Sequence, residues 1–189
     1  MHFALLLLMA APLPPSSTLS GSDGTLSWVV TADGEEVRLD GRSPKWTVSH
    51  WATPELTPLR TRRTDEDGAT VEVAYSDTGA VVKLPKKTVT IDQPGLWDGD
   101  TLDVRLGALV ARGTTDLDFA ALDVANAKVY DFQARLQGQE TCGSSPCSHI
   151  RVTLTGILKA VGPKWHFWFG ADGQMLKFEG PIGTFAVEG

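Results

Sequence analysis

The chain has 189 residues, of which 42% are hydrophobic and 21% are charged. This length and composition are typical of one globular domain with a packed core, and they exclude a disordered chain. The formal net charge of −6 argues against nucleic acid as a partner, because binding to phosphates needs clustered Lys and Arg.

The N-terminal segment predicts a signal peptide. Residues 3–11 form an almost unbroken apolar run, and a proline-rich stretch follows it. The run has the length of a signal-peptide hydrophobic region and is too short to cross a hydrocarbon core of about 30 Å. We expect residues 1–11 to be a signal peptide and the protein to be periplasmic or secreted, with no transmembrane segment. The alternative is an apolar tail that packs on the domain.

The next segment, residues 12–24, is rich in Pro, Ser and Gly, which is typical of a flexible linker. From residue 25 onward, apolar and polar side chains alternate with the period of two that predicts β-strands. Turn sequences such as Asp33-Gly34 and Asp67-Gly68 separate these strands. We expect a single β-rich domain over residues 25–189, and its first half is a meander with strands at residues 25–31, 35–39, 46–51, 57–64, 69–76, 80–84 and 88–91.

A helix interrupts the strands in the middle of the chain. Residues 102–112 (LDVRLGALVAR) carry apolar side chains at helical spacing, and Gly113 follows at the position that often ends a helix. Asp100 or Thr101 is the expected N-cap. A calcium loop at Asp98 and Asp100 is the alternative, but it lacks further acidic ligands.

Strands resume after the helix, and two of them flank the segment TCGSSPC. Residues 128–137 and 149–158 alternate well, and Gly, Ser and Pro between Cys142 and Cys147 predict a tight turn. In an exported protein we expect a disulfide between Cys142 and Cys147 near the tip of this hairpin. Free thiols and a metal or redox pair are the alternatives, and a metal site lacks further ligands nearby.

The order of strand meander, helix and second strand meander predicts a mainly β fold. We expect a curved antiparallel sheet, or a partly open barrel, with one helix packed against it.

Recognisable catalytic signatures are missing from the sequence. It has no phosphate-binding loop, no nucleophile elbow and no pair of His residues at metal-ligand spacing on a helix. His50 and His166 lie in predicted strands without a visible partner for general base catalysis. We expect no enzymatic activity, no catalytic residues, no metal and no cofactor. A hydrolase that pairs one of these His residues with a carboxylate is the alternative.

The segment 164–169 (KWHFWF) carries bulky aromatic side chains on both faces of a predicted strand. Trp165 and Phe167 share one face, and His166 and Trp168 share the other. One face can contact the core while the other lines an apolar cavity. We therefore predict that Trp165, Phe167 and Trp168 bind a ligand, and the alternative is that all of them fill the core.

Three segments carry a resemblance to a known group: TPELTPLRTRR at 53–63, DGDTLDVRLGALVARG at 98–113 and KWHFWFGADGQMLKFEGPIGTFAVEG at 164–189. They resemble landmarks of a family of uncharacterised exported bacterial domains of unknown function. The matching positions include Leu56, Pro58 and Arg60, then Asp172-Gly173 and the final strand. The resemblance implies a curved half-barrel sheet, similar to that of lipoprotein carriers (a β-clam), which holds lipids or lipoprotein tails and has no catalytic residues.

These observations lead to two functional hypotheses. The first is a non-enzymatic exported monomer that binds an apolar small molecule or a lipid within a curved sheet. The second is a structural or protein-interaction module of the cell envelope with a filled core. A ligand-sized cavity in the structure favours the first hypothesis.

Overall fold

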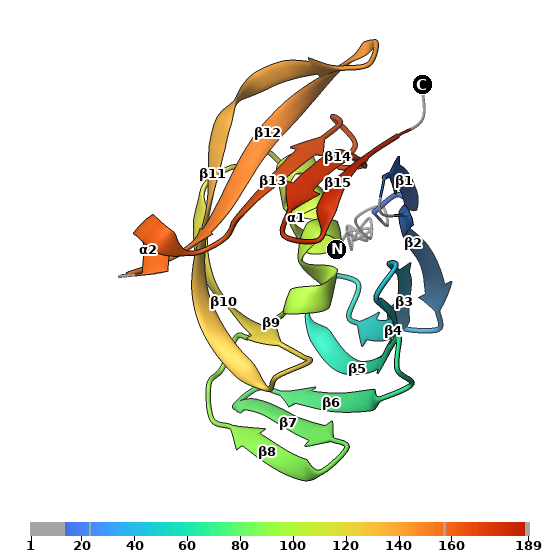
Figure 1. Ribbon diagram of the computed structural model, residues 1–189, viewed down its shortest axis with the longest axis vertical. Helices are drawn as coiled ribbons and strands as arrows, with labels where there is room; N and C mark the ends of the chain where they lie inside the picture. Colours follow the sequence, from blue (N-terminus) through green and yellow to red (C-terminus); the bar gives the residue numbers. More distant parts are fainter. Residues whose placement is uncertain (1–13, 23, 157, 188–189) are drawn as a thin grey trace, which may run out of the picture.

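The computed structural model describes residues 14–22, 24–156 and 158–187 (Figure 1). Its main feature is one 15-stranded sheet that curls around helix α1 (Leu102–Ala111). The 3-10 turn η1 (Gly99–Thr101) precedes α1, and a single helical turn, α2 (Leu158–Val161), follows the twelfth strand. The predicted fold class is confirmed. No helix within the described ranges is long and apolar enough to span a membrane.

The strands before the helix form a meander, since each pairs with the next in antiparallel fashion. They are β1 (Ser17–Gly21), β2 (Gly24–Asp33), β3 (Glu36–Arg42), β4 (Trp46–Ala52), β5 (Pro58–Asp65), β6 (Thr70–Ser76), β7 (Gly79–Leu84) and β8 (Lys87–Ile91).

The strands around and after the helix form a second meander. They are β9 (Trp97–Asp98), β10 (Leu117–Asp123), β11 (Lys128–Cys142), β12 (Ser145–Leu154), β13 (Lys164–Phe169), β14 (Met175–Gly180) and β15 (Gly183–Ala186). The short strand β9 pairs in parallel with β10, whereas the other pairs are antiparallel.

The two meanders become one sheet because β1 pairs with β15, at Ser20 and Ala186. Apolar side chains also join the ends of the curl, where Val71 and Val82 of the first meander share a core cluster with Leu122 and Val124 of the second. The curled sheet is therefore held together by hydrogen bonds along its length and by hydrophobic packing between distant strands.

The prediction of a flexible linker over residues 12–24 is wrong for residues 17–21, which form a strand. Strand β1 occupies residues 17–21, lies between β2 and β15, and buries Leu19 completely. Strand pairing, at five positions with β2 and at one with β15, overrides a local composition that favours a linker. The predicted signal peptide, residues 1–11, lies outside the described residues.

The predicted helix is confirmed, and its position explains Gly107. A Cβ atom at Gly107 would overlap the carbonyl oxygen of Gly173 in the β13–β14 turn and would crowd the ring of Phe169. The glycine lets α1 approach this hairpin closely, so that Leu106 is buried in the same core cluster as Phe169. The helix is thereby fixed inside the curl of the sheet.

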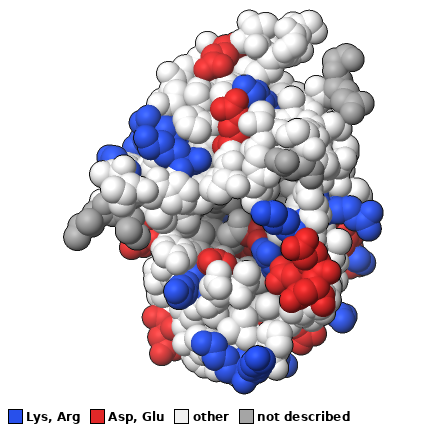
Figure 2. All heavy atoms as spheres, in the orientation of Figure 1, with Lys and Arg blue, Asp and Glu red and all other residues white. Residues whose placement is uncertain are grey.

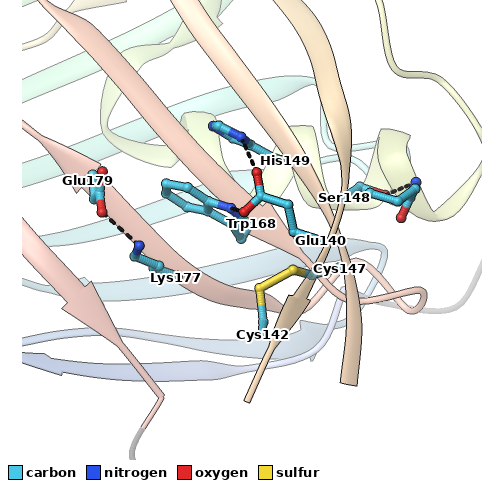
Figure 3. Close-up of a disulfide and its surroundings, with 9 residues drawn as sticks. Glu140, Cys142, Cys147, Ser148, His149, Trp168, Lys177 and Glu179 are labelled. Carbon is cyan, nitrogen blue, oxygen red and sulfur yellow. Dashed lines mark hydrogen bonds and ion pairs between the residues drawn. A yellow bond between two sulfur atoms is a disulfide. The ribbon is translucent and has the colours of Figure 1, made fainter. Parts of the chain in front are cut away.

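The hairpin β11–β12 projects beyond the other strands, and the predicted disulfide Cys142–Cys147 lies near its tip (Figure 1). Their Cα atoms are 5.9 Å apart, and the two residues are separated by five positions in the sequence. Figure 3 shows this disulfide beside a cluster of polar side chains on β11, β12 and β13.

Candidate functional site

A cavity of about 630 Å³ lies inside the curled sheet. Its lining comes from η1 and α1, from β2 and β4, and from strands β10 to β14. The face shown in Figure 2 is hollowed near its centre. The volume lies within the range of about 300–1,000 Å³ that is typical of small-molecule sites.

Aromatic side chains make up much of the cavity wall. Trp165 and Phe167 of β13 line it together with Phe132 of β11. The rings of Phe132 and Trp165 meet edge to face, with centroids 5.6 Å apart. Trp28 of β2 and Trp46 of β4 also line the cavity, and the centroids of their rings are 6.0 Å apart. Aromatic packing of this kind gives the cavity a large apolar surface of defined shape.

The predicted ligand-binding residues are divided between the two faces of β13. Trp165 and Phe167 line the cavity, but Trp168 does not. Its indole stacks on His149 at 4.3 Å, and its Nε1 donates to Glu140 Oε2 at 2.8 Å (Figure 3). The separation follows from strand alternation, because residue 168 points away from the face of residues 165 and 167.

Asp103 places a carboxyl group in the cavity wall at the start of α1. Its Oδ2 accepts a hydrogen bond from Trp28 Nε1 at 2.7 Å, and its Oδ1 accepts one from the backbone N–H of Val104 at 2.9 Å. Burial raises the pKa of Asp103 from 3.8 to about 7, and these two donors oppose the rise. The carboxyl group therefore titrates near neutral pH.

Asp100 of η1 adds a second carboxyl group to the lining. Its Oδ1 accepts a hydrogen bond from Arg63 Nη1 at 2.6 Å, whereas its buried Oδ2 has no partner among the described residues. Burial raises its pKa to about 7, with the charge of Asp98 acting in the same direction and Arg63 opposing both. Of the two carboxyl oxygens of Asp100, Oδ1 therefore has a donor and Oδ2 has none among the described residues.

Asp98 anchors the turn that carries Asp100. Its side chain is fully buried and accepts hydrogen bonds from the hydroxyl groups of Thr61 and Tyr75 and from the backbone N–H of Asp100. Burial alone would raise its pKa, but the hydrogen bond and charge of His50, with the two hydroxyl donors, hold the pKa below its ordinary value. Asp98 therefore has a structural role, since it holds η1 through hydrogen bonds to two strands and to the backbone.

Of the two predicted N-cap residues, Thr101 holds the N-cap position of α1 and Asp100 does not. Asp98 caps the first turn, η1, while Thr101 precedes α1 without making a side-chain cap hydrogen bond. Asp100 pairs with Arg63 instead. The sequence signal was a local capping pattern, whereas Arg63 lies 37 positions away, so a local reading had no means to find this pairing.

The two His residues considered for catalysis lie in different surroundings. His50 is buried, and its Nδ1 lies 2.6 Å from Thr61 Oγ1 and 3.4 Å from Asp98 Oδ2. His166 Nδ1 lies 2.8 Å from His149 Nε2, and burial lowers its pKa, with the charge of His149 acting in the same direction. Neither imidazole lines the cavity. The lack of enzymatic activity stays a prediction, as does the lack of a cofactor.

Metal-ligating side chains do not gather into a site in the part of the chain that the structure covers. No group of three or more His, Cys, Asp or Glu residues in the described ranges has the arrangement needed to hold a metal ion. The pair His149 and His166 adjoins Glu140, which hydrogen bonds to the far side of the His149 ring.

The fold and the cavity define a barrel-like protein in which an open, curled sheet surrounds a helix. The structure is similar to the crystal structure of a beta-barrel-like protein of the domain of unknown function DUF1849 from Brucella abortus, with a TM-score of 0.55. The two chains are 12% identical, and the similarity covers 89% of this chain and 90% of that chain. At this identity the likeness concerns the fold alone. No family model and no curated protein matches the sequence.

Proposed function

We propose that this protein is a non-enzymatic binding protein that holds an apolar or lipid-like ligand in the cavity inside its curled sheet. The observation that carries the proposal is an aromatic-lined cavity of about 630 Å³ in a chain of 189 residues. A filled interior would have favoured the structural or interaction module, because that role needs no space for a ligand.

The wall chemistry supports an apolar ligand. Each square ångström of apolar surface removed from water contributes about 25 cal/mol, so a chain of methylene groups against Phe132, Trp165 and Phe167 gains affinity in proportion to its buried length. These side chains are already packed against one another, which lowers the entropy lost when the ligand binds.

Export to the periplasm or out of the cell forms part of the same proposal. A disulfide at Cys142–Cys147 is compatible with an oxidising compartment. The apolar run at residues 3–11 supports it further. The sequence resemblance to exported domains of unknown function, which implies a curved half-barrel sheet of the kind that holds lipids, points in the same direction. We propose that the protein acts in the cell envelope as a monomer.

Binding of an apolar fluorescent probe, with native mass spectrometry of gently purified protein alongside, tests the proposal. We expect saturable probe binding and a lipid-like adduct. Trp165→Ala should weaken probe binding about tenfold or more, because it removes a large part of the wall. Trp168→Ala changes a residue of the same type on the other face of β13 and should leave the probe affinity within about twofold.

Two outcomes would contradict the proposal. The first is the lack of any adduct together with the lack of saturable probe binding. The second is equal weakening by Trp165→Ala and Trp168→Ala in folded protein, because it would place the binding site outside the cavity.

A further inference from the structure

The charged side chains that line the cavity are all acidic. They are the carboxyl groups of Asp100, Asp103 and Asp123, and the neutral phenol of Tyr130 also lines the cavity. Among the described residues that form the lining there is no Lys, Arg or His. An anionic group that enters the cavity would therefore meet carboxyl groups and no basic side chain.

Arg63, the basic residue that pairs with Asp100, already has two acidic partners. Arg63 donates to Asp100 Oδ1 at 2.6 Å through Nη1 and to Asp65 Oδ1 at 2.7 Å through Nε. Its side chain is only 13% exposed, so it cannot turn toward a ligand without breaking both ion pairs. Arg63 is therefore a structural partner of Asp65 and Asp100 and is not free to pair with a carboxylate or phosphate of a ligand.

The acceptor atom of Asp100 that lacks a donor is the second observation. Its Oδ2 is buried and has no hydrogen-bond partner among the described residues. Leaving a buried acceptor without a donor is costly, and a ligand that supplies the donor recovers that loss on binding. Trp28 and Trp46 also line this cavity, and aromatic ring faces attract cations.

We infer that the ligand is an amphiphile whose polar end is a cationic amine, which donates to Asp100 Oδ2 while its apolar tail lies against the aromatic wall. This inference rests on the proposed function and narrows it to one class of ligand. A carboxylate, buried beside Asp100 and Asp103, is disfavoured by like-charge repulsion and by desolvation.

A competition experiment with three ligands of equal chain length tests this inference. Dodecylamine, dodecanol and dodecanoic acid are each titrated against the full-length protein with the apolar fluorescent probe bound. The titrations are done at pH 8 and below the aggregation concentration of each ligand. We expect the amine to bind about tenfold more tightly than the alcohol, and the acid to bind more weakly than the alcohol.

A matched pair of variants assigns the preference to one carboxyl group. Asp100→Asn keeps an acceptor for Arg63 and removes the charge, so the amine affinity should fall to that of the alcohol. Asp131→Asn makes the same change at an exposed position between the cavity residues Tyr130 and Phe132. It should leave the order of the three ligands unchanged, because strand alternation directs its side chain to the other face of β11.

The outcomes separate this inference from the proposed function. If the alcohol binds but the acid binds as tightly as the amine, the amine inference is wrong and the apolar binding function stands. If none of the three displaces the probe and the probe itself does not bind, the proposed function is wrong. The comparison in the unaltered protein decides the matter even if Asp100→Asn does not fold.

Discussion

Two carboxyl groups at the start of α1 determine the polar character of the cavity at the scale of single residues. Asp103 is held by Trp28 and Val104, and Asp100 is held by Arg63. Both have pKa values of about 7, chiefly because burial disfavours the charged form. A group with a raised pKa makes stability depend on pH in a defined direction.

We predict that the stability of the ligand-free protein falls with increasing pH because of Asp103. Its folded-state pKa, about 7, lies above the ordinary value of 3.8. The folded state therefore binds this proton more tightly, so the contribution is complete below pH 3.8 and is lost as pH rises through about 7. The loss is at most about 1.4 kcal/mol for each pH unit in this window.

Urea unfolding at several pH values between 4 and 8 measures this effect. Asp103→Asn should remove the Asp103 part of the slope, although it lowers stability at acidic pH because the amide nitrogen cannot accept from Trp28 or Val104. Asp131→Asn serves as the exposed control and should keep the slope. An unchanged slope in Asp103→Asn would show that this carboxyl ionises as it does in water.

At the residue scale, the sequence predicted part of the candidate site. Alternation in the segment 164–169 predicted that Trp165 and Phe167 share a face, and both line the cavity. The same alternation separates Trp168 from them, so the three could not form one wall. Asp100 was missed as a cavity residue, because its partner Arg63 is distant in sequence and a local pattern favoured a capping role.

The hairpin β11–β12 carries the disulfide as a local constraint at the scale of secondary structure. Cys142 and Cys147 lie near a tip that projects beyond the other strands (Figure 1), and neither residue lines the cavity. A bridge that closes so short a loop restricts few conformations of the unfolded chain, which gives a stabilisation of about 2 kcal/mol.

We predict that the double variant Cys142→Ser, Cys147→Ser loses about 2 kcal/mol of unfolding free energy and keeps its probe affinity. Hydrogen exchange should become faster at the tip, in Glu140 to Ser148, and should change little in β13. Loss of probe binding in folded variant protein would contradict the separation of the hairpin tip from the cavity.

In helix α1, a contact with a distant part of the chain explains why residue 107 is a glycine. Helix propensity alone predicts that Gly107→Ala stabilises the helix by about 1 kcal/mol. The carbonyl oxygen of Gly173 occupies the space of the added methyl group, so we predict a net destabilisation of about 1–3 kcal/mol. Urea unfolding of this variant decides between the two signs, and a more stable variant would contradict the close approach of α1 to the β13–β14 turn.

The elements themselves were largely predictable because each carries its own periodicity. The period of two predicted the strands of both meanders, and helical spacing with Gly113 predicted α1. Strand β1 was missed, because a segment rich in Pro, Ser and Gly has no strong strand pattern of its own. Pairing with β2, and at one position with the distant strand β15, made it part of the sheet.

At the scale of the whole molecule, the cavity exists because a single sheet curls around a helix. The β1–β15 pairing joins the two meanders. The core cluster that contains Val71 and Leu122 packs strands from the two ends of the sheet against each other. The sequence predicted a curved sheet with a helix, but the volume and the acidic lining of its interior depend on contacts between distant segments. These contacts bring Trp28 of β2 and Asp103 of α1 together across 75 positions of sequence.

The most direct test of ligand binding in this cavity is a crystal structure of the protein with a terminally brominated dodecanol, in which anomalous scattering locates the bromine. The account predicts a bromine peak inside the curl, against Phe132, Trp165 and Phe167. A bromine peak confined to the outer face of the sheet, or a cavity closed by rearranged side chains with no ligand in it, would contradict it.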